Sequence, residues 1–138
     1  MVKSMVLIRR PRDGAILVSE AANPEGELFQ RPLGGHVEFG EYAADTARRE
    51  FEEEIGQQIT GLNRVGVLEN IFDWGERRQH EIVFVFAASF ADDAAYEISE
   101  QTIRDDRRAP RVIWRAADAT TPPLYPAGVA DLAWEATG

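Results

Sequence analysis

The chain has 138 residues, a formal net charge of −9 and no cysteine. This length suits one domain, residues 1–138, with a substantial buried core. The absence of cysteine excludes disulfides, thiolate metal sites and cysteine nucleophiles, and the acidic balance argues against a nucleic acid polymer as partner, since that requires a basic surface.

Membrane and export signals are not found in the sequence. No apolar run approaches the roughly 18 residues of a membrane span, and the first ten residues lack the apolar region and cleavage site of a signal peptide. We therefore expect a cytoplasmic protein with no membrane partner.

The first third of the chain is predicted to be mostly strand. Residues 4–9 and 15–19 read as two strands, and the Asp13-Gly14 pair between them is typical of a hairpin. Residues 23–26 form a loop and residues 28–31 a short strand. A turn is expected at Gly34 and Gly35, before the first helix.

Residues 42–55 are predicted to form an amphipathic helix. Ala44, Ala47, Phe51 and Ile55 follow a three-to-four-residue rhythm, which gives an apolar stripe for packing on a core. Gly56 then stands where helices commonly end in a left-handed residue.

The remainder alternates strands with one further helix. We expect strands at residues 62–72, 81–90 and 111–114, a polar turn at 73–78, and a terminal helix at 127–136. The acidic, then mixed-charge segment 92–108 has weak periodicity. Strands interspersed with two helices predict an α/β fold, a mixed β-sheet with helices on both faces.

The first helix carries an unusual acidic cluster. Glu50, Glu53 and Glu54 stand at i, i+3 and i+4, so their carboxylates converge on one side of the helix and repel one another. A divalent cation converts this repulsion into attraction, and Mg²⁺ prefers oxygen ligands. The alternative is a solvated acidic face. An EF-hand is excluded, because its ligands alternate along a loop.

The stretch from Gly35 to Gln57 resembles the Nudix box, G-x5-E-x7-R-E-U-x-E-E-x-G-U, where U is apolar. The last apolar position holds Gln57 instead. Residues 29–35 also resemble the usual lead-in, and residues 111–114 and 124–126 the usual ending. The matching residues are Gly35, Glu41, Arg49, Glu50, Phe51, Glu53, Glu54 and Gly56.

The resemblance implies a Nudix-type α/β/α sandwich, in which the box forms a loop-helix-loop, and a Mg²⁺ site that Mn²⁺ can also fill. It makes Glu50 and Glu54 the expected metal ligands. Glu53 is a further ligand or the base that activates water, and the backbone carbonyl near Gly34 completes the shell.

The other box residues are given supporting roles by the same resemblance. Arg49 is expected to orient a glutamate through a bidentate pair and thereby to assist catalysis together with Glu50 and Glu53. Glu41 is expected to tie the loop to the helix, and Gly35 and Gly56 to be structural.

The function implied is Mg²⁺-dependent hydrolysis of a diphosphate linkage, in a nucleoside diphosphate joined to another moiety or in a nucleoside triphosphate. The alternative is a non-catalytic Nudix-like nucleotide-binding or sensor domain. The isomerase branch of the family uses a cysteine, which this chain lacks. Substrate identity, the identity of the base and a possible homodimer are left open.

Outside the box, residues 72–80 are predicted to contact the nucleotide-type substrate. Trp74 offers a stacking surface, and Arg77 and Arg78 offer phosphate contacts. The alternative is an ordinary hairpin whose tip carries solvated arginines. A further metal ligand could come from Glu81, Glu97 or Glu100, and the sequence does not choose among them.

Overall fold

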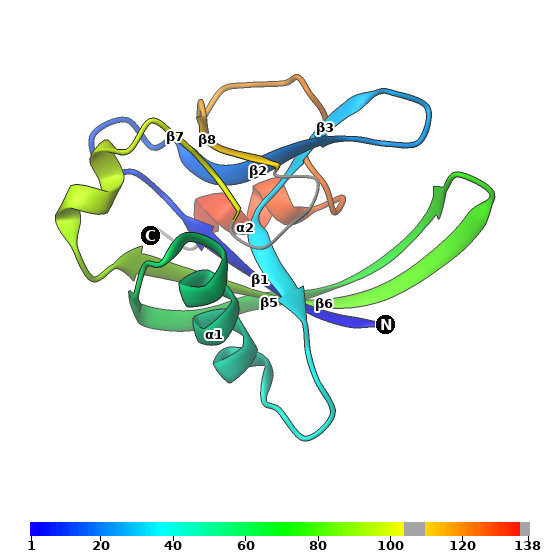
Figure 1. Cartoon of the computed structure of the whole chain (residues 1–138), viewed down its shortest axis with the longest axis horizontal. Helices are drawn as coiled ribbons and strands as arrows, with labels where there is room; N and C mark the ends of the chain where they lie inside the picture. Colours follow the sequence, from blue (N-terminus) through cyan, green and yellow to red (C-terminus); the bar gives the residue numbers. More distant parts are fainter. Residues whose placement is uncertain (104–109, 136–138) are drawn as a thin grey trace.

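The computed structural model describes residues 1–103 and 110–135 (Figure 1). Eight strands, two α-helices and a short 3₁₀ helix follow one another along these residues. Their order is β1 (Val2–Ile8), β2 (Ile16–Ala22), β3 (Leu28–Arg31), β4 (Leu33–His36), α1 (Ala43–Ile55), β5 (Ile59–Trp74), β6 (Arg77–Phe90), η1 (Asp93–Glu97), β7 (Glu100–Thr102), β8 (Arg111–Arg115) and α2 (Val129–Glu135).

The strands form two four-stranded sheets. Sheet A has the order β4-β1-β6-β5 and is mixed, because β1 pairs in parallel with β6 and the other pairs are antiparallel. Sheet B has the order β3-β2-β8-β7 and is antiparallel throughout. The α/β class with helices on both faces of a mixed sheet is confirmed, and sheet B is an additional layer.

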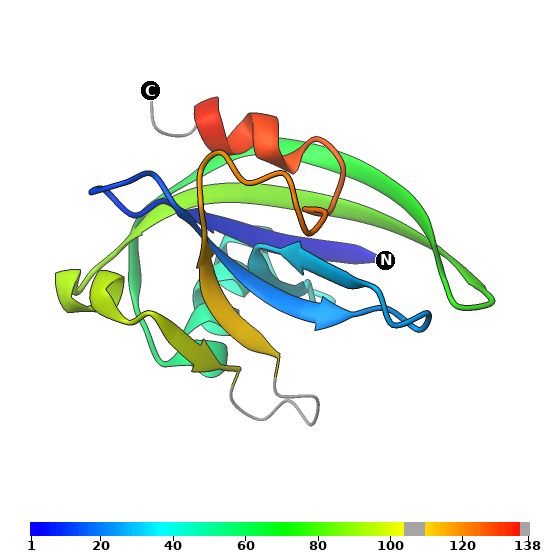
Figure 2. The same ribbon diagram turned by 90° about the horizontal axis from the view of Figure 1, so that it is seen from above.

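Side chains along β1 alternate between the two faces of sheet A, and this explains how the layers stack. Val6 and Ile8 point to one face of sheet A and join a buried cluster with Phe51 of α1. Met5 and Leu7 point to the other face, which packs beneath sheet B and α2. Figures 1 and 2 show α1 on one side of sheet A, with sheet B and α2 on the other.

Helix α1 is anchored by its apolar stripe. Ala47, Phe51 and Ile55 are buried, and Gly56 caps the C-terminal end of the helix. The φ of Gly56 is 68°, which is left-handed, and its N–H donates to the Glu52 carbonyl at 2.9 Å. Burying a side chain such as Phe51 contributes roughly 1.5–3 kcal/mol. The anchored stripe therefore holds the charged face of α1 in place.

Several local predictions are corrected by the structure. The strands around Gly14 share one isolated bridge, between Arg9 and Ile16, before they part into different sheets, so they form no extended hairpin. Gly34 and Gly35 lie within β4 rather than in a turn. The turn predicted at 73–78 is shorter, because β5 runs to Trp74 and β6 begins at Arg77.

Segment 92–108, which had no clear period, contains η1 and β7, and its residues 104–108 lie outside the described residues. The last position of the predicted terminal helix, Ala136, also lies outside them. Across residues 1–103 and 110–135, no helix has the length and apolar content to cross a membrane.

Candidate active site

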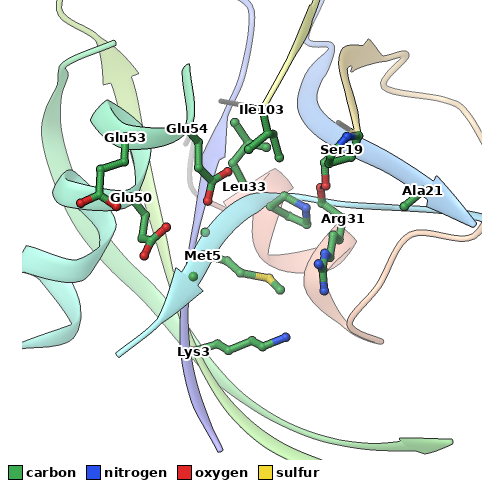
Figure 3. A pocket seen from close by; sticks show the side chains of 14 residues that line it. Lys3, Met5, Ser19, Ala21, Arg31, Leu33, Glu50, Glu53, Glu54 and Ile103 are labelled. Atoms are coloured by element: carbon green, nitrogen blue, oxygen red, sulfur yellow. The ribbon is translucent and has the colours of Figure 1, made fainter. Parts of the chain in front are cut away.

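The charged face of α1 opens into a cavity of about 380 Å³ between the helix and the two sheets. Glu50, Glu53 and Glu54 form its acidic wall, and Gly34 and Gly35 of β4 lie beside them. Across from this wall, the side chains of Lys3 and Arg31 enter the same cavity from sheet A and sheet B (Figure 3). The cavity is therefore acidic on one side and basic on the other.

The position of Glu50 depends on the absence of a side chain at Gly35. A methyl group added to Gly35 would lie 2.7 Å from both Cγ and Oε1 of Glu50, closer than such atoms approach in proteins. A glycine here lets the helix carboxylate rest directly against the β4 backbone. The sequence therefore brings a carboxylate and the strand backbone together at one edge of the cavity.

Arg49 joins the carboxylates of the loop and the helix. Its guanidinium makes a bidentate pair with Glu41, from Nε to Oε2 at 2.9 Å and from Nη2 to Oε1 at 3.0 Å. Nη1 donates to Oε1 of Glu50 at 3.0 Å and to Oε2 of Glu53 at 3.3 Å. One planar cation thus restrains two of the cavity's glutamates from the side.

The protonation of this network follows from the same contacts. The Arg49 guanidinium, and then the hydroxyl of Thr46 at 2.6 Å, lower the pKa of Glu41 to about 2. In return, its hydrogen bonds to Glu41 raise the pKa of Arg49. Both groups are therefore charged at neutral pH, and the pair holds the loop before α1 against the helix.

The cavity has the donors that Mg²⁺ requires. The carboxylates of Glu50 and Glu54 are hard oxygen ligands, separated by one helical turn and open to the cavity. Among the described residues, no three His, Cys, Asp or Glu side chains are gathered as a complete metal cluster. Mg²⁺ needs no such cluster, since it binds through one or two carboxylates and keeps several waters. The residues present fit the ion.

The residues predicted to contact substrate are only partly brought together. Trp74 lines a second cavity of about 400 Å³, where its ring meets the ring of Phe29 edge to face at 5.7 Å. Arg77 and Arg78 are exposed beside the hairpin turn and line neither cavity. Nε of Arg78 lies 4.0 Å from Oδ1 of Asp73.

Glu81, Glu97 and Glu100, the three further acidic candidates, do not line the first cavity, and each pairs with a different cation. Oε2 of Glu97 lies 3.2 Å from Nη1 of Arg12, and Oε1 of Glu100 lies 3.6 Å from Nε of Arg111. The side chains of both glutamates are exposed. Glu81 is buried and pairs with Lys3.

Sequence reasoning missed Lys3 and Arg31, which supply the basic side of the first cavity. One available signal was that Lys3 is the only lysine in the 138 residues. Arg31 carried no comparable signal, since it stands among many other arginines.

Comparisons with known proteins agree with this architecture. A MutT NUDIX hydrolase from Burkholderia pseudomallei has 24% sequence identity and a TM-score of 0.66, covering 99% of this chain and 97% of that one. The E. coli ORF135 protein has 21% identity and a TM-score of 0.60, covering 99% and 86%. An Ap4A hydrolase from C. elegans has 14% identity and a TM-score of 0.59, covering 99% and 94%.

These likenesses concern the fold, and no curated protein matches the sequence. The family model of the NUDIX domain matches residues 2–128, which includes the whole of α1 and both sheets. The resemblance of residues 35–57 to the Nudix box is thereby confirmed, and the chain belongs to the Nudix hydrolase family.

Proposed function

We propose that the chain is a single Nudix hydrolase domain that cleaves a diphosphate linkage in a nucleotide-type substrate, with Mg²⁺ as cofactor. The observation that carries the proposal is the first cavity, of about 380 Å³, in which the carboxylates of α1 face Lys3 and Arg31. A polyanionic substrate fits such a space, because its phosphates would meet the metal on one side and cations on the other.

In this proposal Glu50 and Glu54 hold the ion, with the backbone carbonyl of Gly34 as a further ligand, and Glu53 takes the alternative role of base. The ion, which Mn²⁺ could replace, would neutralise phosphate charge and polarise the phosphoryl oxygen. Arg49 keeps Glu50 and Glu53 oriented through its Nη1 contacts.

The chemical step is hydrolysis by water. The water oxygen bonds to phosphorus, the bond from phosphorus to the bridging oxygen breaks, and the bridging oxygen leaves with the departing phosphate. Glu53 is proposed as the base that takes the water's proton. Its side chain is 59% exposed and restrained by Arg49, so water reaches it and its orientation is held.

The test is a substrate panel with Mg²⁺, covering nucleoside triphosphates, oxidised nucleotides, ADP-ribose, nucleotide sugars and dinucleoside polyphosphates, with products identified by mass. We expect hydrolysis of at least one class and its loss in EDTA. Glu53→Gln or Glu54→Gln should lower turnover by about a hundredfold or more, because each removes a charge from the reacting centre.

Glu52→Gln is the matched control. Glu52 lies on the same helix, is exposed and does not line the cavity, so turnover should stay within about twofold of the wild type. Full activity in EDTA, or in both the Glu53 and Glu54 variants, would contradict the proposal. Tight binding without any hydrolysis would favour a nucleotide-binding or sensor domain.

A further inference from the structure

One ion pair stands at the junction of the two cavities. Lys3 of β1 and Glu81 of β6 lie 2.7 Å apart, from Nζ to Oε1, and Glu81 is 3% exposed. Lys3 lines the first cavity together with the α1 carboxylates, and Glu81 lines the second together with Trp74. Met5 and Arg31 line both cavities, so the two spaces adjoin at this pair.

The pair is difficult to explain by stability alone. Removing two charges from water costs free energy that their attraction often fails to recover, and apolar residues of similar size frequently replace such pairs without loss. The same face of sheet A already carries buried Met5 and Val83 next to the pair. An apolar pair would therefore suit this layer.

What the pair does provide is an ammonium group held at a cavity wall. A lysine ammonium has three N–H donors, and a single oxygen of Glu81 occupies one of them. The side chain of Lys3 is 14% exposed, and its head enters the cavity on the same side as Arg31, across from Glu50 and Glu54 (Figure 3). Of the 15 lysine and arginine residues in the sequence, this is the one lysine.

We propose that Lys3 binds a phosphate group of the substrate at the junction of the cavities, and that Glu81 is the residue that positions it. The inference rests on the proposed function and narrows its substrate class to compounds whose phosphates and attached group fit both cavities. The substrate's phosphates reach from the α1 carboxylates to Lys3, with Arg31 as a second cation, and the group attached to the last phosphate enters the cavity lined by Phe29 and Trp74.

The single lysine makes a direct test possible. Protein labelled with ¹³C-lysine gives one side-chain Cε signal, which is followed by NMR during titration with methylenediphosphonate, a diphosphate that cannot be hydrolysed at its bridge. We expect a saturable shift of this signal, in the presence and absence of Mg²⁺. Binding detected by calorimetry with an unmoved Lys3 signal would overturn the proposal.

This measurement needs no turnover, so it separates the two proposals. A wild type that shifts the Lys3 signal but hydrolyses no compound of the panel contradicts the proposed function and supports the role of Lys3. A wild type that hydrolyses a diphosphate while the signal stays unmoved overturns only the role of Lys3.

Variants extend the test to affinity. The double variant Lys3→Met/Glu81→Leu removes both charges and leaves no buried carboxylate unpaired, so the fold should be kept. Its Kd for methylenediphosphonate should rise about tenfold or more, the loss expected for one charged hydrogen bond. Arg12→Met removes an exposed cation that lines neither cavity and should leave the Kd within about twofold.

Two single variants separate binding from positioning. Lys3→Arg keeps the charge and should recover part of the affinity lost in the double variant. Glu81→Gln should shift the Lys3 signal before any ligand is added and raise the Kd by less than the double variant does. A double variant that binds as tightly as the wild type would show that the pair is structural only.

Discussion

At the scale of single residues, the two neighbouring glycines of β4 have different reasons for lacking a side chain. A methyl group on Gly34 would overlap the backbone carbonyl of Ser4 and lie 2.8 Å from Cα of Met5, whereas one on Gly35 would meet the carboxylate of Glu50. The backbone of β1 cannot move away from Gly34 without disturbing the β1–β4 pairing, whereas the side chain of Glu50 can rotate away from Gly35. The missing side chain is therefore required by the sheet at Gly34 and by the position of Glu50 at Gly35.

This difference predicts opposite outcomes for two adjacent substitutions. Gly34→Ala should lower the free energy of unfolding by about 1–3 kcal/mol, because overpacking against backbone strains the sheet. Gly35→Ala should lose less stability but about tenfold or more in Mg²⁺ affinity, since the displaced Glu50 is an expected ligand. Urea unfolding and metal titration measure the two effects, and equal losses of stability in both variants would refute the distinction.

The Glu41–Arg49 pair predicts a dependence of stability on pH. The pKa of Glu41 is lowered from 4.5 to about 2 by Arg49, so the unfolded chain binds the proton first as the pH falls. The stabilisation is complete above pH 4.5 and is lost as the pH falls towards 2. Urea unfolding of wild type and Glu41→Gln should therefore converge over this range. A constant difference between them would contradict this account.

At this scale, the sequence predicted which site residues lie together only where they are neighbours along the chain. Arg49, Glu50, Glu53 and Glu54 lie within six positions on one helix, so helical geometry alone places them together. Lys3 and Glu81 are 78 positions apart and meet only because β1 pairs with β6. Patterns along a sequence contain no information about which distant strands become neighbours.

At the scale of elements, the β5–β6 hairpin extends beyond the body of sheet A (Figure 1). The sequence predicted two strands here, but it predicted them too short, because the charged residues near the tip were interpreted as a turn. Asp73 pairs with Arg78 and Trp74 with Arg77 in the ladder, so polar residues that read as a turn are strand residues. A solvated hairpin places polar residues on both faces, which removes the alternation that marks a strand.

Trp74 on this hairpin is predicted to serve substrate binding. It is half-buried and lines the second cavity, so Trp74→Ala should raise KM several-fold and change Tm little, because one stacked base contributes about 1–3 kcal/mol. Val67→Ala, which shortens an exposed side chain elsewhere on β5, should leave KM unchanged. A large loss of stability, the roughly 3–5 kcal/mol of a core tryptophan, with normal KM would make the hairpin structural.

At the scale of the whole molecule, metal binding should stabilise the fold. Three carboxylates on one face of α1 repel one another, and an ion that binds only the folded state shifts the unfolding equilibrium by mass action, by about 2.7 kcal/mol at a hundred times its Kd. Mg²⁺ should therefore raise Tm by several degrees. Glu50→Gln/Glu54→Gln should lose most of this response and Glu52→Gln should keep it. An unchanged response in the double variant would place the ion elsewhere.

The fold class was predictable from the order of elements, and the division into two sheets was not. The Asp13-Gly14 turn reads locally as a hairpin, yet the chain continues from β1 in sheet A to β2 in sheet B. Strand order depends on side-chain packing between layers, as in the buried cluster that includes Met5 of sheet A and Val18 of sheet B. Such packing follows from the assembled molecule and not from the turn.

The place of β1 in the middle of sheet A has a consequence for how the protein is made. On the ribosome β1 is synthesised well before its neighbour β6 (Arg77–Phe90), which follows only after β2 to β5. Until then β1 has β4 on one side and an open edge on the other, which invites pairing with other chains. A nascent chain that stalls before residue 77 should therefore depend on chaperones, since β1 still lacks one of its two neighbouring strands.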